Sequence, residues 1–334
     1  KEKFDLDEEQ LRPYFELNNV RDGVFTLANK LYGITFVPRK DIPKYHKDVQ
    51  VYEVFDKNKK HLAVLYMDFF PRESKRGGAW MTNYREEYKI KGKMVTPIIS
   101  LVCNFTPPTG NSPSLLTFDE VETLFHEFGH GLHGMFASGT YRSISGTHVS
   151  RDFVELPSQI MENWCSEPEM LKLYAKHYKT GEVIPASLVE KMKKSGHFGQ
   201  GFATTEIIAA SLLDMTYHKI KTELKGYISK FENDEMKKIG LINEIIPRYR
   251  STYFQHIFSG GYSSGYYSYT WAGVLDADAF QAFKEKGLFD RKTADSFRKN
   301  VLSKGKTEDP MKLYVRFRGA EPSTEPLLRK RGLK

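Results

Sequence analysis

The sequence contains only two cysteines among its 334 residues, Cys103 and Cys165, and this scarcity excludes a fold held together by a framework of disulfides. It has no apolar run that approaches the ~20 residues needed to span a bilayer, and it shows no internal repeat or low-complexity linker. It also lacks long blocks of one charge sign, because 50 Lys and Arg residues are interleaved with 42 Asp and Glu residues. These absences predict a soluble globular protein that does not span a membrane.

The residues that are present allow a large core. Hydrophobic residues make up 40% of the chain and aromatic residues 13%, which is enough for one large or two ordinary domains. The net charge is +8, and the one basic cluster, residues 329–331 with Lys334, suits the C-terminus of a last helix. We therefore expect no nucleic-acid partner.

Hydrophobic periodicity divides the chain into a mixed front part and a helical remainder. Apolar residues between positions 7 and 32 recur at a spacing near 3.6, which predicts two helices that meet near residues 21–23. Residues 49–55 and 61–69 flank a polar turn and predict a β-hairpin, and the apolar run 97–105 predicts a strand inside a sheet.

Beyond residue 117 the pattern becomes mostly helical. The expected helices lie near 118–136, 152–165, 167–178, 186–195, 203–224, 233–251, 266–285 and 289–303. The simplest fold is one compact α+β unit, predominantly α-helical, with a small antiparallel or mixed β-sheet in its N-terminal third. Residues 1–110 then hold helices and the sheet, and residues 111–334 hold the helical part with the chemical motifs.

The strongest chemical signal is the pattern H-E-x-x-H at residues 126–130. Residues four apart project from one face of a helix, so His126 and His130 can both turn an imidazole nitrogen toward one metal ion, with Glu127 placed to reach a water beside it. Thr117 opens the segment with a capping box, which predicts an amphipathic helix around the pattern. So short a pattern also arises by chance, in which case both histidines are ordinary core or surface residues.

A catalytic zinc takes three protein ligands and leaves one position for water, so the pattern needs a further donor. His133 lies on the same helix face, but a rise of 1.5 Å per residue places it roughly 10 Å along the axis from His126, and we expect it to line the site instead. A third histidine ten residues after the first is also missing, because that position is Phe136.

The best donor elsewhere is Glu155, which follows His130 after 24 residues and lies among hydrophobic side chains, where an unpaired carboxylate is costly. Asp152 and Glu162 compete with it. Asp152 suits a helix N-cap, and Glu162 could face the same side and orient a ligand. Glu122, one turn before the first histidine, could fix an imidazole tautomer. A surface charge or a cap explains each supporting carboxylate equally well.

A second unusual stretch, residues 256–271, is rich in tyrosine and glycine. Its three glycines predict a mobile or tightly folded loop, and Tyr266 and Tyr269 share a face if a helix begins here. Phenol groups aimed at a developing oxyanion would stabilise a tetrahedral intermediate, whereas a purely structural aromatic cluster is the alternative.

Two adjacent glycines, Gly77 and Gly78, precede Ala79 and Trp80 in the front part. Without side chains they let another backbone approach, so an edge strand here could pair with an extended peptide. A plain glycine loop explains the composition equally well.

Four motifs in this order together resemble the thimet-oligopeptidase family of zinc peptidases. They are the H-E-x-x-H pattern, the segment 145–159, the stretch 256–271 and the closing residues 317–322. Within the family, the chain is most similar to the bacterial peptidyl-dipeptidase (dipeptidyl carboxypeptidase) branch, with oligopeptidase A as its neighbour. The resemblance implies a zincin-type catalytic domain, and it corresponds to the catalytic C-terminal half of the family's proteins.

The resemblance also implies roles for individual residues. One zinc ion (Zn²⁺) is held by His126, His130 and Glu155, and Glu127 is the general base. The residues expected to stabilise the transition state are Tyr266 and Tyr269, and those expected to contact the substrate are His256, Tyr262, Gly78 and Ala79. Behind the ligands, we expect support from Glu122, Asp152 and Glu162.

The expected function is zinc-dependent hydrolysis of peptide bonds in short, unfolded peptides, with release of C-terminal dipeptides. The alternatives are an oligopeptidase that cuts internally, a zinc hydrolase of non-peptide substrates, and a zinc-containing module that binds peptides without cutting them. The expected partners are these peptides and the N-terminal half of the same polypeptide. The chain begins with Lys1 and shows no signal-peptide pattern, which we interpret as a processed or truncated N-terminus. The bacterial cytoplasm, the periplasm and secretion therefore all stay open.

Overall fold

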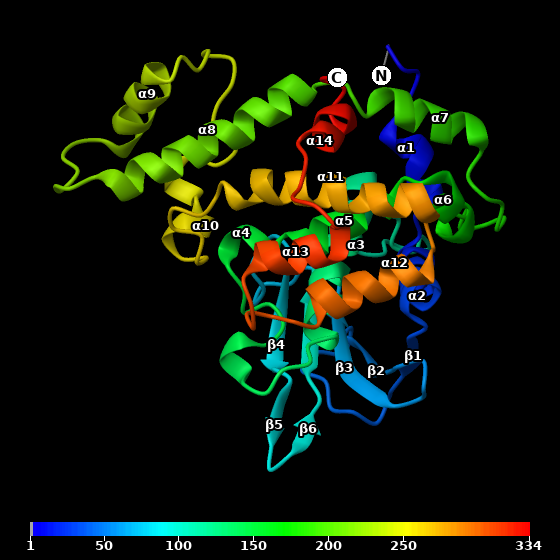
Figure 1. Ribbon diagram of the computed structural model, residues 1–334. Coiled ribbons are helices and arrows are strands. Elements are labelled where there is room, and N and C mark those ends of the chain that lie inside the picture. Colours follow the sequence, from blue (N-terminus) through cyan, green and yellow to red (C-terminus); the bar gives the residue numbers. More distant parts are fainter. Residues whose placement is uncertain (1–2) are drawn as a thin grey trace.

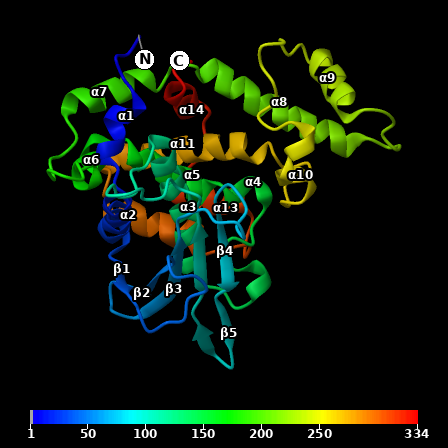
Figure 2. The same ribbon diagram turned by 180° about the vertical axis from the view of Figure 1, so that it is seen from behind.

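The computed structural model describes residues 3–334, and its helices are layered on one side of a small β-sheet (Figures 1 and 2). The five-stranded sheet has the order β1-β2-β3-β7-β4, and β5 and β6 form a separate hairpin that projects away from the helices (Figure 1). The strands are β1 Thr35–Pro38, β2 Gln50–Phe55, β3 His61–Asp68, β4 Trp80–Arg85, β5 Tyr88–Ile90, β6 Lys93–Val95 and β7 Ile98–Val102.

The predicted hairpin and inner strand are confirmed. β2 and β3 are antiparallel, with Val51 opposite Tyr66, whereas β7 lies parallel to β3, with Leu101 opposite Met67. The sheet is therefore mixed. β7 is buried along most of its length, as a continuous apolar run requires, and β4, which pairs with β7 alone among the described strands, forms one edge of the sheet.

Helices make up most of the regular structure. They are α1 Glu8–Leu11, α2 Leu17–Tyr32, α3 Phe118–Met135, α4 Arg151–Val154, α5 Leu156–Cys165, α6 Pro168–Tyr174, α7 Ala186–Ser195, α8 Gln200–Lys219, α9 Ile228–Lys238, α10 Gln255–Phe258, α11 Ser268–Lys286, α12 Arg291–Phe297, α13 Pro310–Arg318 and α14 Glu325–Lys330. Single turns of 3-10 helix occupy Arg12–Tyr14, Arg142–Ile144 and Ser251–Tyr253, and a π-helical segment occupies Arg298–Leu302. The predicted α+β class, predominantly helical, is confirmed.

Four helices stack in succession above the sheet. α3 packs on β7, α5 on α3, α11 on α5 and α14 on α11. Fully buried side chains fill these layers, among them Phe125 and Phe128 of α3 and Trp164 of α5. α8 and α9 extend beyond the stack as an arm, seen at the upper left of Figure 1. Within residues 3–334, no helix has both the length and the apolar character that a bilayer span needs.

Several helix boundaries differ from the prediction, and two of them have a clear physical reason. The N-terminal helices separate at residues 12–16, and α2 continues through Gly23. A Cβ at Gly23 would lie 2.6 Å from the Cβ of Tyr174, so this glycine serves the packing of α2 on α6 and does not break the helix. The helix expected over 233–251 is instead α9, which ends at Lys238 before Gly240 adopts a left-handed conformation (φ 77°).

A buried ion cluster fixes the glycine loop that leads into β4. Asp68, at the end of β3 and only 2% exposed, accepts hydrogen bonds from Arg72 (2.9 Å) and Lys75 (3.0 Å). Burial alone would raise the pKa of the Asp68 carboxyl, but the hydrogen bonds from both cations outweigh burial and hold the pKa below its usual value. Asn104 donates to the carbonyl oxygen of Gly78 (2.7 Å), so the loop is held on both sides.

The substitution Asp68→Asn should destabilise the protein by about 2–3 kcal/mol at pH 7, because it leaves the buried Lys75 without a carboxylate. A lowered carboxyl pKa stabilises the folded state fully above the unfolded value of about 3.9, and this stabilisation is lost as the pH falls through the folded pKa. The difference between variant and wild type in denaturant unfolding should therefore shrink below about pH 3. Asp234→Asn, which removes an exposed pair with Lys230, is the control and should change stability little. A difference that is the same at both pH values would contradict this account.

Candidate active site

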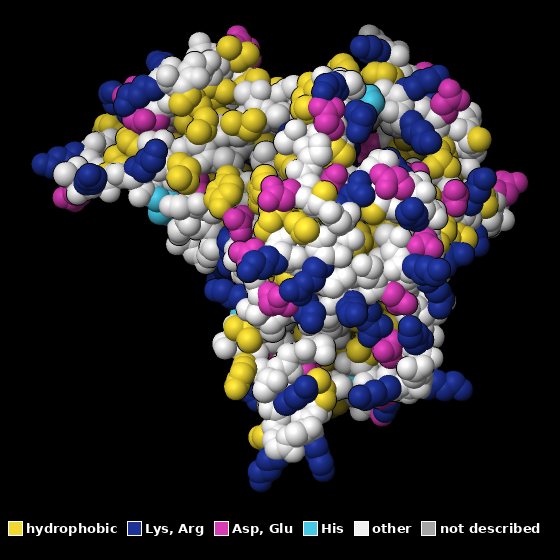
Figure 3. All heavy atoms as spheres, in the orientation of Figure 1, with side chains coloured by type: hydrophobic (Ala, Val, Ile, Leu, Met, Phe, Trp, Pro, Cys, Tyr) yellow, Lys and Arg dark blue, Asp and Glu magenta, His cyan; other side chains and the backbone are white. Residues whose placement is uncertain are grey.

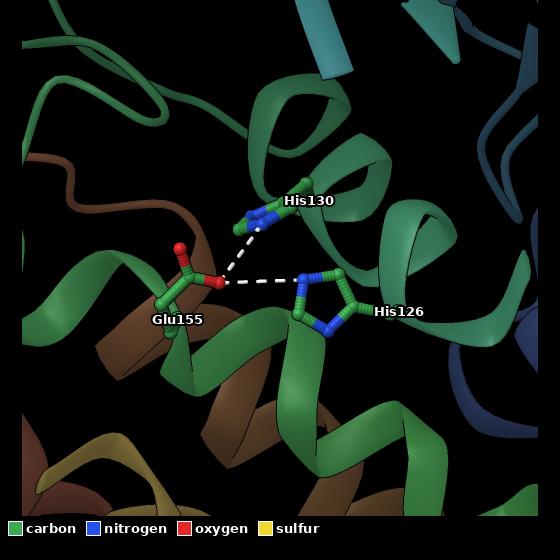
Figure 4. Close-up of side chains that lie close together, drawn as sticks. All are labelled: His126, His130 and Glu155. Atoms are coloured by element: carbon green, nitrogen blue, oxygen red, sulfur yellow. Dashed lines mark ion pairs between the residues drawn. The ribbon is translucent and has the colours of Figure 1, made fainter. Parts of the chain in front are cut away.

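Helix α3 presents the H-E-x-x-H pattern as the sequence predicted. The capping box is present: the Thr117 hydroxyl accepts from the backbone N–H of Glu120 (3.1 Å), and the Glu120 carboxylate accepts from the N–H of Thr117 (2.9 Å). The apolar side chains of α3 are buried against the sheet and the neighbouring helices. His126 and His130 thereby lie on the face that is turned toward α5 (Figure 4).

The contact between α3 and α5 is unusually close at Gly129. A Cβ at this position would lie 2.2 Å from the carbonyl oxygen of Pro157, so the two helix backbones meet where the motif has no side chain. Glu155 stands at the junction of α4 and α5, two residues before Pro157. The single helix expected over 152–165 is therefore two helices, and Glu155 lies at the break between them.

His126, His130 and Glu155 converge on one point (Figure 4). The Nε2 atoms of the two imidazoles lie 3.3 and 3.2 Å from Oε2 of Glu155. A tetrahedral ion with bonds of ~2.0–2.1 Å has ligand atoms about 3.3 Å apart, so these separations fit one small cation. Across residues 3–334, this is the one group of three or more His, Cys, Asp or Glu whose donor atoms lie close enough to share an ion. The imidazoles are 20% and 13% exposed, which leaves one side of the group open to solvent.

The two carboxylates of Glu162 and Glu122 differ in whether they contact a histidine. Glu162 Oε1 lies 2.6 Å from Nδ1 of His126, which makes Nδ1 the donor and leaves Nε2 free for a metal. Glu122 makes no such contact within the described chain; burial first, and then the charges of Glu162 and Asp119, raise the pKa of its carboxyl to about 7.

Asp152 is not the cap that the sequence suggested. The N-cap residue of α4 is Ser150, because the helix begins one residue earlier than expected, at Arg151. The Asp152 carboxylate instead accepts a hydrogen bond from the Tyr267 hydroxyl (3.3 Å). Asp152 and Glu162 both lie outside the group that can share an ion.

Glu127 and His133 are both buried, with different consequences. Burial raises the pKa of the Glu127 carboxyl, against the opposing effect of the two neighbouring histidines, and its Oε2 has no hydrogen-bond partner in the described residues. Nδ1 of His130 is likewise unpartnered there. Orphaned buried atoms beside three convergent donors fit a site that takes a metal ion and water. His133 lies outside the group, and burial lowers its pKa to about 3, so its ring is neutral.

The tyrosine-glycine stretch folds against the open side of this group. The Tyr262 hydroxyl donates to Oε1 of Glu155, and the Tyr262 ring stacks on Tyr269 at a centroid distance of 5.4 Å. The His256 ring lies 5.5 Å from that of Tyr266. α11 begins only at Ser268, so Tyr266 belongs to a turn and not to the helix that its spacing suggested.

Burial sets the protonation of these side chains. It raises the pKa values of Tyr266 and Tyr269, so both phenols remain protonated donors at neutral pH. It lowers the pKa of His256, which favours the neutral imidazole. The structure places these groups together; their roles stay predictions.

The glycine pair lies in the loop that leads to the edge of the sheet, a position that is compatible with both interpretations. Gly78, at φ 86°, and Ala79 directly precede β4, the edge strand. The binding of a peptide along this edge stays a prediction.

Two residues around the loop escaped sequence reasoning. The Arg151 guanidinium carbon lies 4.5 Å from the ring centroid of Tyr262. Asp214 of α8 is completely buried and accepts hydrogen bonds from the backbone N–H groups of Ser264 and Tyr266, both at 2.9 Å. The only signal for Asp214 in the sequence was its place as a lone charged residue directly after the apolar stretch 207–213.

A small mixed sheet, a helix bearing H-E-x-x-H, and a glutamate from the next helices define the class as a zincin-type metallopeptidase region. Residues 1–333 match the model of peptidase family M3, and the chain belongs to this family. The predicted resemblance to the thimet-oligopeptidase family is thereby confirmed. Membership in a family of metallopeptidases implies a divalent metal ion.

Two sequence relatives and one solved structure illustrate the likeness. A dipeptidyl carboxypeptidase of Escherichia coli is 47% identical over 336 residues, which cover 100% of this chain and 49% of that protein. Oligopeptidase A of Escherichia coli is 42% identical, covering 99% of this chain and 49% of that protein. The chain thus spans about half the length of these relatives. An M32 carboxypeptidase structure from Deinococcus radiodurans shares the fold at 15% identity, with a TM-score of 0.53 over 97% of this chain and 60% of that one.

The substitution Glu162→Gln should weaken Zn²⁺ binding about 10–100-fold, because an amide cannot supply the charged acceptor that orients His126. Competition against a chromogenic chelator at neutral pH measures this affinity. The matched control is Glu122→Gln, since Glu122 contacts no imidazole in the described chain and its pKa of about 7 already leaves the carboxyl partly protonated. Equal losses in both variants would show that general charge, and not the contact with His126, governs the affinity.

Proposed function

We propose that the chain is the catalytic part of a zinc peptidase that acts on short, unfolded peptides and releases dipeptides from their C-termini. The observation that carries the proposal is the convergence of His126, His130 and Glu155 on one point beside the buried Glu127. Family membership supports peptide hydrolysis, and the relative named as a dipeptidyl carboxypeptidase supports the release of dipeptides.

The three convergent side chains would hold one Zn²⁺, which when bound polarises the scissile carbonyl and lowers the pKa of a water molecule. Glu127 accepts the proton of the attacking water at its unpartnered Oε2 and then delivers it to the leaving nitrogen. Burial raises the pKa of this carboxyl above its usual value, in the direction that suits a group that accepts and then returns a proton. No covalent intermediate with the protein is required.

The tyrosines act on the opposite side of the substrate. Tyr266 and Tyr269 donate hydrogen bonds from their hydroxyl groups to the developing oxyanion, and burial keeps both phenols protonated. Tyr262 holds Oε1 of Glu155, which leaves Oε2 facing the imidazoles, and His256 contacts the substrate backbone. The edge strand β4, entered through Gly78, accepts an extended peptide by strand addition.

Internal cleavage of short peptides is the second candidate. The oligopeptidase A relative matches 99% of this chain, nearly as much as the dipeptidyl carboxypeptidase does. In addition, an edge strand binds the peptide backbone without recognising a free C-terminus. The two candidates share all of the metal and base chemistry. They differ only in whether the carboxylate at the peptide's end is recognised.

The arm offers a surface for the rest of a longer polypeptide. Phe202, Ile208, Leu212 and Met215 of α8 are all exposed, although the opposite side of the same helix is buried. Figure 3 shows hydrophobic side chains gathered over α8 and α9. A helix that is apolar on two sides is normally covered on both, and relatives of about twice this length supply a segment that could cover it.

A pair of peptides that differ only at the C-terminus tests the function. The 334-residue chain, and the longer polypeptide where one exists, are incubated with a free peptide and its amidated form, with and without a chelator. We expect dipeptides from the free peptide alone, and no product in the presence of the chelator. Internal cuts in both peptides would favour the oligopeptidase. Binding without cleavage by either protein would contradict the proposal and leave a peptide-binding module.

The substitution Glu127→Gln should lower kcat by a factor of about 10² or more while the zinc content stays unchanged, because the amide keeps the shape of the side chain but cannot accept the proton. Elemental analysis of the purified variant gives the metal content. Glu155→Ala is the companion variant and should lose the metal itself. Retained activity in Glu127→Gln at full zinc occupancy would remove Glu127 from its role.

A further inference from the structure

Asp214 is a carboxylate buried outside the metal group. It lies on α8 with no exposed surface, and the tyrosine-glycine loop covers it. One carboxylate oxygen accepts the backbone N–H of Ser264 (2.9 Å), and the other accepts the backbone N–H of Tyr266 (2.9 Å). Nδ1 of His218, one helical turn further along α8, lies 2.8 Å from the first oxygen. A buried carboxylate is costly without partners, and this one obtains two from the loop and one from His218 of its own helix.

The two backbone contacts select one conformation of the loop. Ser264 has a φ of 53°, in the left-handed region that residues other than glycine seldom occupy. Its N–H and that of Tyr266 must point the same way to meet both oxygens of one carboxylate. The other backbone hydrogen bonds of the turn, such as Gly265 N–H to the carbonyl of Tyr262 (2.8 Å), are local, and the contacts of Tyr262 with Glu155 and of Tyr267 with Asp152 are made by side chains. Asp214 therefore fixes the loop relative to α8.

The loop that Asp214 holds also reaches the metal group. Tyr266 is itself bonded to Asp214 through its backbone, and Tyr262, two residues before Ser264, donates its hydroxyl to Glu155. The rings of Tyr262 and Tyr269 are stacked, so a shift of the turn moves Tyr262 and Tyr266 and changes the contact with Tyr269 on α11. Asp214 touches neither the metal group nor the place where a substrate would lie.

We propose that Asp214 is a positioning residue for the peptidase reaction: by binding the backbone of Ser264 and Tyr266, it sets the position of Tyr266, the loop tyrosine that stabilises the transition state. The inference rests on the proposed function for its catalytic consequence. The two hydrogen bonds by which Asp214 holds the loop are a property of the fold and are independent of that function. Asp214 lies on α8, whose apolar residues Ile208, Leu212 and Met215 are exposed. A segment that covered these residues would also restrict the movement of the loop that Asp214 holds.

Hydrogen exchange of the complete protein tests the hold directly. In Asp214→Asn, one carboxylate oxygen is replaced by an NH₂ group that faces an N–H donor, so one of the two contacts is lost without a change of size. We expect the loop amides around Ser264 and Tyr266 to exchange at least about 10-fold faster, with the amides of α11 unchanged. Unchanged exchange in the loop would overturn the proposal whether or not the protein cleaves peptides.

Kinetics test the catalytic consequence. Asp214→Asn should lower kcat about 10-fold with little change in KM or in zinc content, because the tyrosines act in the transition state. Tyr266→Phe should then cost clearly less in the Asp214→Asn background than in the wild type, since the phenol is already misplaced. Additive losses, or an unchanged kcat despite faster exchange of the loop, would overturn the positioning role.

Ser211→Ala is the matched control on the same helix. Ser211 is nearly buried, but its hydroxyl donates to the carbonyl of Ile207 within α8 and not to the loop (2.8 Å). It should change neither the exchange of the loop nor kcat. If Asp214→Asn fails to fold, Ser264→Gly and Ser264→Pro replace it. Glycine retains the N–H and the left-handed conformation and should keep both readouts, whereas proline removes the donor and cannot adopt the φ of 53°, so it releases the turn from Asp214 and should raise exchange and lower kcat.

Discussion

The contact of the α3 and α5 backbones at Gly129 is the constraint on which the site depends. The carbonyl oxygen of Pro157 lies where a Cβ of residue 129 would be, so any side chain there would force the two helices apart. Glu155 is tied to Pro157 by two peptide units, and its Oε2 must stay about 3 Å from both imidazoles if one ion is to be shared. The nominally free position inside H-E-x-x-H is therefore restricted by the third ligand, which comes from another helix.

The carboxylates near the histidines differ in their hydrogen-bond partners, and this difference limits what each carboxylate can do. Glu162 is bound to Nδ1 of His126 and can only orient it, whereas Glu155 is held on one oxygen by Tyr262 and offers the other to the imidazoles. Glu127 alone keeps a buried oxygen without a partner in the described residues, so it can take up a proton. The roles that we propose for the three glutamates, which are orienting His126, holding the metal and accepting a proton, follow from these differences in hydrogen bonding and not from residue type.

Sequence patterns within a short window predicted the parts of the molecule that depend on residues close together in the chain. The hairpin, the capping box of α3 and the pairing of His126 with His130 follow from periodicities of two and 3.6, and a simple rise per residue excluded His133. The failures have two causes. Gly23 inside α2 is set by Tyr174, which is distant in sequence, whereas the helix break at Glu155 and the end of α9 lie beside Pro157 and Gly240, local signals that periodicity alone did not weigh. Asp214 is the extreme case, because its partners lie about 50 residues away and are backbone atoms.

The site consequently has two parts of unequal rigidity. The ligands stand on α3 and at the α4–α5 junction, inside layers whose side chains are fully buried, so the core of the fold holds the metal geometry. Tyr266 stands on a loop that is fixed to α8, whereas Tyr269 stands on α11, and α8 belongs to an arm with an uncovered apolar side. A region with fewer buried contacts opens at a lower free energy than the core does. The geometry proposed for the metal therefore depends on the layered core, whereas the position proposed for Tyr266 depends on how firmly the arm is held.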